Sequence, residues 1–271
     1  MKRTANAWIR CLTTLAVLAV ALLFSRSAPG ADGFAARDFR LLPVRVHLLT
    51  ATAAPELNCE LKASDVRRIL GKVNDIWKPA GLLFYAESVR REAAANQELY
   101  AALGENRTFA HLQQIRPRAS RAPRMVHVYY LHQMRANGVI LGADYRLIFV
   151  KDTSRLRPTP GGIDEPLPRV TAHEIGHGLG LPHRQDFTNL LASGTTGTSL
   201  NAAEIHTARA TAGRWTWALS PAAADARAAA LWSGKKRDAA RALYTALARL
   251  PGDDVLTRRA RARAQTADAS P

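Results

Sequence analysis

Cysteine is scarce in this chain of 271 residues, which has only Cys11 and Cys59. Cys11 begins an N-terminal apolar run that we expect to be removed, which would leave Cys59 alone. A single cysteine cannot form an internal disulfide bond, even in a compartment that permits one. The remaining chain, about 240 residues, is long enough to bury one substantial core. The fold is therefore expected to depend on packing and not on covalent cross-links.

Long apolar runs are equally rare. Cys11–Phe24 is an uncharged, mostly apolar run of fourteen residues that follows three basic residues. It is shorter than the roughly 20 residues that span a bilayer, and small residues follow it. This pattern is typical of an export signal peptide over residues 1–30, with a retained membrane anchor as the alternative. It predicts a secreted or periplasmic protein, and no later run predicts a transmembrane segment in the mature chain.

Acidic residues are few: 22 Asp and Glu stand against 38 Lys and Arg, a formal net charge of +16. Residues 1–30 hold four basic residues and no acidic ones, so the rest of the chain keeps 16 − 4 = +12. A basic exported protein could bind an anionic envelope surface, and the alternative is an arginine-rich surface that serves solubility. No nucleic-acid-binding motif occurs, so no specific nucleic-acid partner is predicted.

What the chain does have is the segment His173–His183, which reads H-E-x-x-H-x-x-G-x-x-H. His173 and His177 are four residues apart, so on a helix they project from one face. Gly180 permits a left-handed backbone and a sharp exit from the helix, after which the chain can return to bring in His183. Three imidazoles with a fourth position open are the layout of a catalytic Zn²⁺ site.

Glu174 lies at the edge of the face that carries the two helical histidines. Its carboxylate can take a proton from a water molecule instead of binding the metal, so we predict Glu174 as the catalytic general base. A downstream glutamate, Glu204, is a rival third ligand in place of His183. The spacing of Gly180 and His183 favours the histidine.

This motif resembles that of the metzincin zinc metalloproteases, and its hydrophobic and glycine positions look most like the matrixin branch. Asn189-Leu190-Leu191 stands where the family has a methionine-containing turn beneath the zinc site. Leu191 therefore takes the place of the methionine, and an apolar side chain of similar size can serve by packing. The similarity covers the motif in full and extends to this turn.

The resemblance implies an α+β fold with a mixed twisted sheet, a long helix and a zinc-binding active-site helix. It implies a secreted zinc-dependent endopeptidase that hydrolyses a protein or peptide substrate, with Zn²⁺ on His173, His177 and His183. The alternative is a binding or envelope-adhesion protein that keeps the zinc fold but has weak or no turnover. Three features support this alternative: Leu191, the basic charge, and a C-terminal extension, residues 216–271, that looks partly like a helical repeat. A monomer is favoured, although no pattern fixes the oligomeric state.

Alternating and helical patterns predict the remaining elements. Ser64 is expected to cap a helix that ends before Pro79, the segment 91–116 to be partly helical, and 152–168 to be a loop. Asn201 begins a capping box with Glu204. The expected strands are 39–51, 82–89, 125–134, 139–141 and 145–151.

The short strand Val139–Leu141 resembles the sheet edge to which a metzincin substrate adds as one more strand, with an ordinary strand as the alternative. We expect a metzincin-like domain over 31–215 and a helical C-terminal extension with a basic tail over 216–271. Part of the extension looks weakly like half of a tetratricopeptide repeat. A helical pair that packs on the catalytic domain is the other interpretation.

Overall fold

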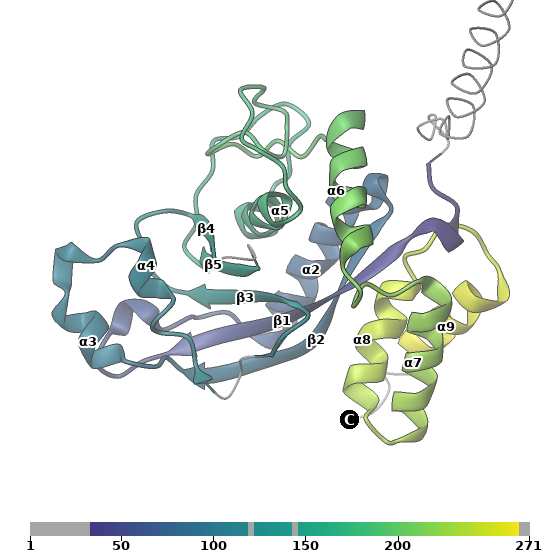
Figure 1. The fold of residues 1–271 in the computed structure, drawn as a ribbon, viewed down its shortest axis with the longest axis horizontal. Helices are drawn as coiled ribbons and strands as arrows, with labels where there is room; N and C mark the ends of the chain where they lie inside the picture. Colours follow the sequence, from purple (N-terminus) through teal and green to yellow (C-terminus); the bar gives the residue numbers. More distant parts are fainter. Residues whose placement is uncertain (1–32, 119–121, 143–145, 266–271) are drawn as a thin grey trace, which may run out of the picture. The chain divides into compact units, whose positions relative to one another are not determined.

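A five-stranded sheet, in the order β2-β1-β3-β5-β4, organises the chain (Figure 1). The computed structural model describes residues 33–118, 122–142 and 146–265, so the predicted signal peptide lies outside the described residues. Neighbouring strands are parallel except for β4, which runs antiparallel to β5 at the edge. The strands are β1 (Arg40–Thr50), β2 (Leu82–Ala93), β3 (Val126–Leu131), β4 (Gly138–Leu141) and β5 (Leu147–Lys151).

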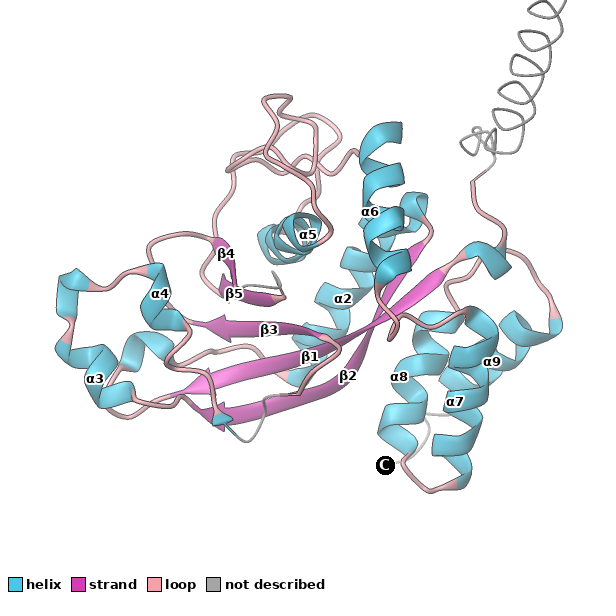
Figure 2. Cartoon of the chain, viewed as in Figure 1, coloured by secondary structure: helices cyan, strands magenta, loops and turns pink. Residues whose placement is uncertain are grey.

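Helices cover both faces of this sheet (Figure 2). The α-helices are α2 (Ala63–Trp77), α3 (Gln97–Ala102), α4 (Phe109–Leu112), α5 (Pro166–Gly178), α6 (Ala202–Arg214), α7 (Pro221–Ser233), α8 (Arg237–Leu247) and α9 (Val255–Gln265). Short 3₁₀ turns lie at Ala36–Asp38, Pro55–Leu57, Lys78–Ala80 and Gly104–Asn106. The predicted α+β mixture with a mixed sheet is confirmed, and within the described residues no helix is long and apolar enough to cross a membrane.

The face of the sheet that carries α2 and α5 holds the largest apolar core. Strand side chains alternate between the two faces, and Val44 and Val46 of β1 point into this core. Trp77 at the end of α2 and Ile175 of α5 are buried in the same cluster. This packing fixes α5 against the sheet, beside the edge strand β4.

The opposite face is covered in two places. At one end, α7, α8 and α9 pack on Leu41 and Leu83 of the first two strands. Backbone bonds join Leu41 and Leu219 in both directions, each with an N···O distance of 2.9 Å. At the other end, the segment with α3 and α4 packs around Leu49 and Phe149. The C-terminal helices therefore share a core with the sheet.

The starts of two helices differ from the sequence-based prediction. The α2 helix begins at Ala63, and its capping bond runs from the Lys62 N–H to the Asp65 carboxylate at 2.8 Å, so Ser64 lies inside the first turn. The α5 helix begins at Pro166, inside the segment predicted as a loop, because proline is well tolerated at the first position of a helix.

Candidate metal centre

The end of α5 brings together the three histidines of the motif. The Nε2 atom of His177 lies 3.1 Å from the Nε2 atom of His173 and 3.1 Å from that of His183. The helix stops because Gly180 adopts a φ of 86°. The Gly180 N–H then bonds to the His177 carbonyl, and the Leu181 N–H bonds to the Gly176 carbonyl. This left-handed helix end turns the chain back and returns His183 to the cluster.

The Nδ1 atoms of two of these rings form hydrogen bonds with backbone carbonyls. His173 Nδ1 lies 2.8 Å from the Leu190 carbonyl oxygen, and His177 Nδ1 lies 2.7 Å from that of Leu181. A carbonyl can only accept, so each Nδ1 carries the proton. Burial lowers the pKa of His173 to about 3 and also lowers the pKa of His177, so both rings are neutral near neutral pH. Each Nε2 therefore presents a lone pair to the cluster.

These lone pairs provide a test of whether the residues fit a metal ion. Two Nε2 lone pairs 3.1 Å apart repel each other unless a cation lies between them. Imidazole nitrogens bind zinc at about 2.0–2.1 Å, which places tetrahedral neighbours roughly 3.3 Å apart. Among the described residues, these three histidines form the group that could hold a metal ion. The donor set and its spacing fit such an ion.

Glu174 lies beside the histidines on α5, with 6% of its surface exposed. Burial raises the pKa of its carboxyl group to about 8, against the opposing influence of the Arg169 charge. The edge strand passes very close to it, because a Cβ atom at Gly138 would lie 2.7 Å from Glu174 Oε1. Only glycine allows β4 to approach this carboxylate so closely.

Together these groups border an open cleft of about 600 Å³. The edge strand β4 forms one wall, and the chain after the helix end forms the other. The lining residues are Gly138, Val139, Ile140, Glu174, His177, Gly180, Leu181, Pro182 and His183. An extended chain entering this cleft would meet a sheet edge, a carboxylate and two of the histidines.

Leu191 lies beneath α5 and is completely buried. Its Cδ1 atom would be 3.2 Å from a Cβ atom at Gly176, so the leucine packs directly on the helix backbone. The turn that carries it is held by the Asn189 side chain, which accepts the Leu191 N–H at 2.7 Å. An apolar residue thus packs under the histidine helix, at the position where the sequence resembles the methionine turn.

Arg169, which the sequence analysis did not single out, ties this turn to α5. It is 2% exposed, and its guanidinium donates to the carbonyls of Gly197 and Ala192. Its Nη1 also lies 3.2 Å from His173 Nδ1. The one sequence clue to this role is spacing, because Arg169 precedes His173 by four residues and so lies on the same helix face.

Glu204, the rival ligand, has other partners. Its carboxylate accepts from the Arg184 Nε at 2.7 Å, from the Asn189 side-chain amide at 2.8 Å and from the Asn201 N–H at 2.9 Å. The last of these bonds belongs to the predicted capping box at the start of α6. The Glu204 carboxylate thus joins α6 to the Leu191 turn, and these hydrogen bonds occupy its oxygens.

No protein-family model matches the chain, and no curated protein matches it. Among solved structures, the chain is similar to metalloproteinase-II from Bacteroides fragilis, with 13% sequence identity and a TM-score of 0.35. The similarity covers 69% of this chain and 58% of that chain, which is less than two thirds of the length of that protein. The structural neighbour is thus a bacterial metalloproteinase, at a similarity too low to assign this chain to its family.

Proposed function

We propose that this protein is a zinc-dependent endopeptidase of the metzincin type. The observation that carries the proposal is the convergence of three histidines beside a buried carboxylate, in a cleft that runs along a sheet edge. His173, His177 and His183 would hold the zinc ion. When bound, zinc supplies Lewis-acid chemistry, because it polarises a peptide carbonyl and makes a water molecule more acidic.

Glu174 is the general base in this proposal. Its raised pKa, about 8, reflects a carboxylate with little solvent around it, and such a group holds a proton more readily than an exposed one. It would take a proton from the attacking water and pass it to the leaving amine. The strand β4 would bind the substrate backbone, because an edge strand offers unpaired N–H and C=O groups to an extended peptide.

We also propose a role for each part of the chain. Residues 1–30 would direct export to the periplasm or the exterior, residues 31–215 would form the catalytic part, and 216–271 would be a helical extension. The substrate would be a protein or peptide. The matrixin-like character rests on the motif and on the turn at Leu191.

The substitution Glu174→Gln tests this mechanism. The amide keeps the size of the side chain but cannot accept a proton, and general acid–base groups contribute typically about 10²–10⁴-fold. Chelator-sensitive cleavage of a peptide library should therefore fall by at least about a hundredfold. Zinc content, measured by elemental analysis, should match that of the parent protein.

Glu165→Gln is the matched control, because this carboxylate at the start of the same helix pairs with Arg68 and Lys72 and lies outside the cleft. It should leave cleavage unchanged. Robust cleavage by the Glu174→Gln protein would refute the assigned base. A parent protein that binds zinc and peptides but cleaves none would instead be a binding protein.

A further inference from the structure

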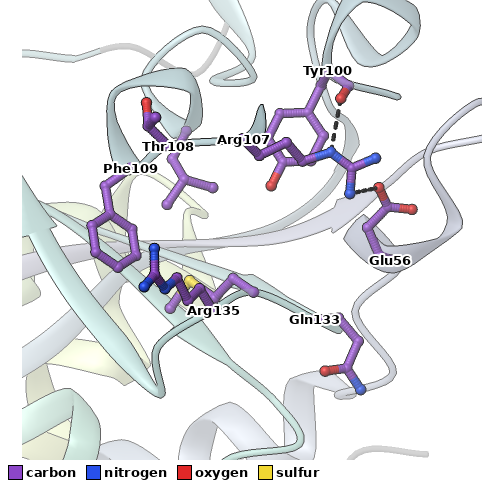
Figure 3. A pocket seen from close by; sticks show the side chains of 9 residues that line it. Glu56, Tyr100, Arg107, Thr108, Phe109, Gln133 and Arg135 are labelled. Carbon is purple, nitrogen blue, oxygen red and sulfur yellow. Dashed lines mark hydrogen bonds and ion pairs between the residues drawn. The ribbon is translucent and has the colours of Figure 1, made fainter. Parts of the chain in front are cut away.

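A second cavity, of about 360 Å³, lies outside the histidine cleft (Figure 3). The segment around α3 and α4 forms one side, and the loop between β3 and β4 forms the other. The residues that line it are Glu56, Tyr100, Arg107, Thr108, Phe109, Leu112, Gln133, Met134 and Arg135. None of them lines the histidine cleft.

One wall of this cavity carries a cation and an anion that are paired with each other. Arg107 forms an ion pair with Glu56 at 2.5 Å and donates from Nε to the Tyr100 carbonyl at 2.9 Å. Its guanidinium also lies over the Tyr100 ring, 4.7 Å from the centroid. Since Glu56 neutralises Arg107, neither residue offers a net charge to a ligand.

The other side of the cavity carries the positive charge of Arg135. Arg135 is exposed, and within the described residues its side chain forms no hydrogen bond or ion pair. Phe109, which is 38% exposed, lines the same cavity, and both side chains are labelled in Figure 3. The apolar side chain of Leu112, which is 2% exposed, also lines the cavity. The cavity therefore combines one free guanidinium with an apolar and aromatic surface.

The loop that supplies Arg135 leads directly into the cleft. Gly138 follows Arg135 by three positions, which span at most about 11 Å of extended chain. Gly138 begins β4 and packs against Glu174. A peptide that lies along β4 with a bond beside Glu174 would bring a residue only a few positions away to the mouth of this cavity.

We infer that this cavity is a substrate subsite that binds a carboxylate on the peptide, either an acidic side chain or a free C-terminus. The inference rests on the proposed peptidase function. Arg135 binds the carboxylate, because a planar guanidinium matches its two oxygens. Phe109 packs on the apolar part of the same residue. Arg135 is thus a specificity-determining residue for acidic substrates.

The test uses the full exported chain and a peptide that it cleaves. Glutamate and glutamine are exchanged at each position on both sides of the scissile bond, and kcat/KM is measured for each pair. At one position, kcat/KM should be roughly tenfold higher for glutamate than for glutamine, because this ratio corresponds to one charge-assisted hydrogen bond. A second series of peptides ends at that position, with the C-terminus as a free acid or as an amide. This series distinguishes a C-terminal carboxylate from an acidic side chain.

Arg135→Gln should remove this preference by raising KM for the acidic peptides. The control is Arg155→Gln, an exposed arginine near the same loop but outside the cavity. It should keep the preference. An acid-to-amide ratio that is equal in the parent and in Arg135→Gln would overturn the inference, whatever the protein cleaves.

If no peptide is cleaved, the proposed function fails. A direct binding measurement then tests whether the cavity binds a carboxylate. The probe is 3-phenylpropanoate, compared with its amide by calorimetric titration of the parent and both variants. Binding of the acid over the amide that is lost in Arg135→Gln supports a carboxylate site. Equal binding of the two probes, or none, overturns it.

Discussion

The Arg169 side chain lies against the histidine cluster, although the motif does not contain it. Replacing it with methionine should leave the carbonyls of Ala192 and Gly197 without their donor, and an unmet buried polar group costs about 1–3 kcal/mol. The turn that positions the Leu190 carbonyl would loosen, and with it the orientation of the His173 ring. We expect a lower melting temperature and weaker zinc retention, measured by competition with a chelator.

Arg209 provides the control for that change. It also donates to three backbone carbonyls, those of Asp38, Ala80 and Gly81, but it lies on α6 and contacts none of the histidines. Arg209→Met should lower the melting temperature and leave zinc retention unchanged. Equal zinc retention in the two variants would show that Arg169 has only a structural role.

The Cys59 thiol should be inert in the folded protein. It is 3% exposed, and burial raises its pKa to about 12, so at pH 8 almost none of it is the reactive thiolate. Alkylation by iodoacetamide should be at least about a hundredfold slower in the native protein than in urea. Fast native alkylation, followed by mass spectrometry, would show that the thiol is accessible.

The same pKa shift has a defined sign for stability. Because the folded pKa is raised, the contribution is present below the ordinary thiol pKa, about 8.5, and is lost as the pH rises towards 12. A Cys59→Ala variant should therefore lose less stability than the parent over that range of pH.

The sequence predicts those residues of the candidate metal centre that lie close together along the chain. His173, Glu174 and His177 share one helix, and Gly180 marks its end, so the motif specifies their placement. The roles of Arg169 and Gly138 depend on segments far along the chain. No local pattern distinguishes a buried arginine that binds a distant turn from an exposed one.

Among the elements, α6 has the most specific anchor. Asn201 accepts the Glu204 N–H at 2.9 Å, and the Glu204 carboxylate returns to the Asn201 N–H, as the capping box predicts. The same carboxylate also binds Arg184 and Asn189, which no helix rule includes. The sequence therefore predicts the start of the helix but not its tie to the Leu191 turn.

Glu204→Gln should weaken this tie. One carboxylate oxygen becomes an NH₂ group that cannot accept, so a buried donor loses its partner, and the charge opposite Arg184 disappears. The expected loss is about 1–3 kcal/mol, seen as a lower midpoint in thermal unfolding. The control Asp238→Asn alters a carboxylate with 98% of its side chain exposed and should not change the midpoint. Similar midpoints for both variants would contradict the proposed anchor.

Element types were predicted well and their ends less well. Each of the five predicted strand segments overlaps an observed strand. The strand β2 continues four residues beyond its expected end, to Ala93, and includes the charged residues Arg90, Arg91 and Glu92. The segment 91–116 was expected to be partly helical, and it holds two short helices around Gly104–Asn106. The cavity beside them could not be predicted, because Glu56 and Arg135 reach it from other parts of the chain.

For the whole molecule, the boundary proposed at residue 215 has a direct test. The apolar cluster under α7, α8 and α9 includes Leu41 and Leu83, which are completely buried. A chain that ends at residue 215 would expose both side chains, and each buried leucine is worth about 1.5–3 kcal/mol. We expect the shortened protein to aggregate or to bind a hydrophobic dye, while the chain that includes 216–271 does not. A cooperative thermal transition of the shortened chain, near that of the longer one, would show that the catalytic part folds alone.

The pair of backbone bonds between Leu41 and Leu219 also determines the order in which the chain can assemble. The two residues are 178 positions apart, so the first strand cannot complete its pairing until most of the polypeptide is present. Contacts of such long sequence separation slow folding. In a chain that emerges from its N-terminus, the first strand therefore stays incomplete until residue 219 has followed.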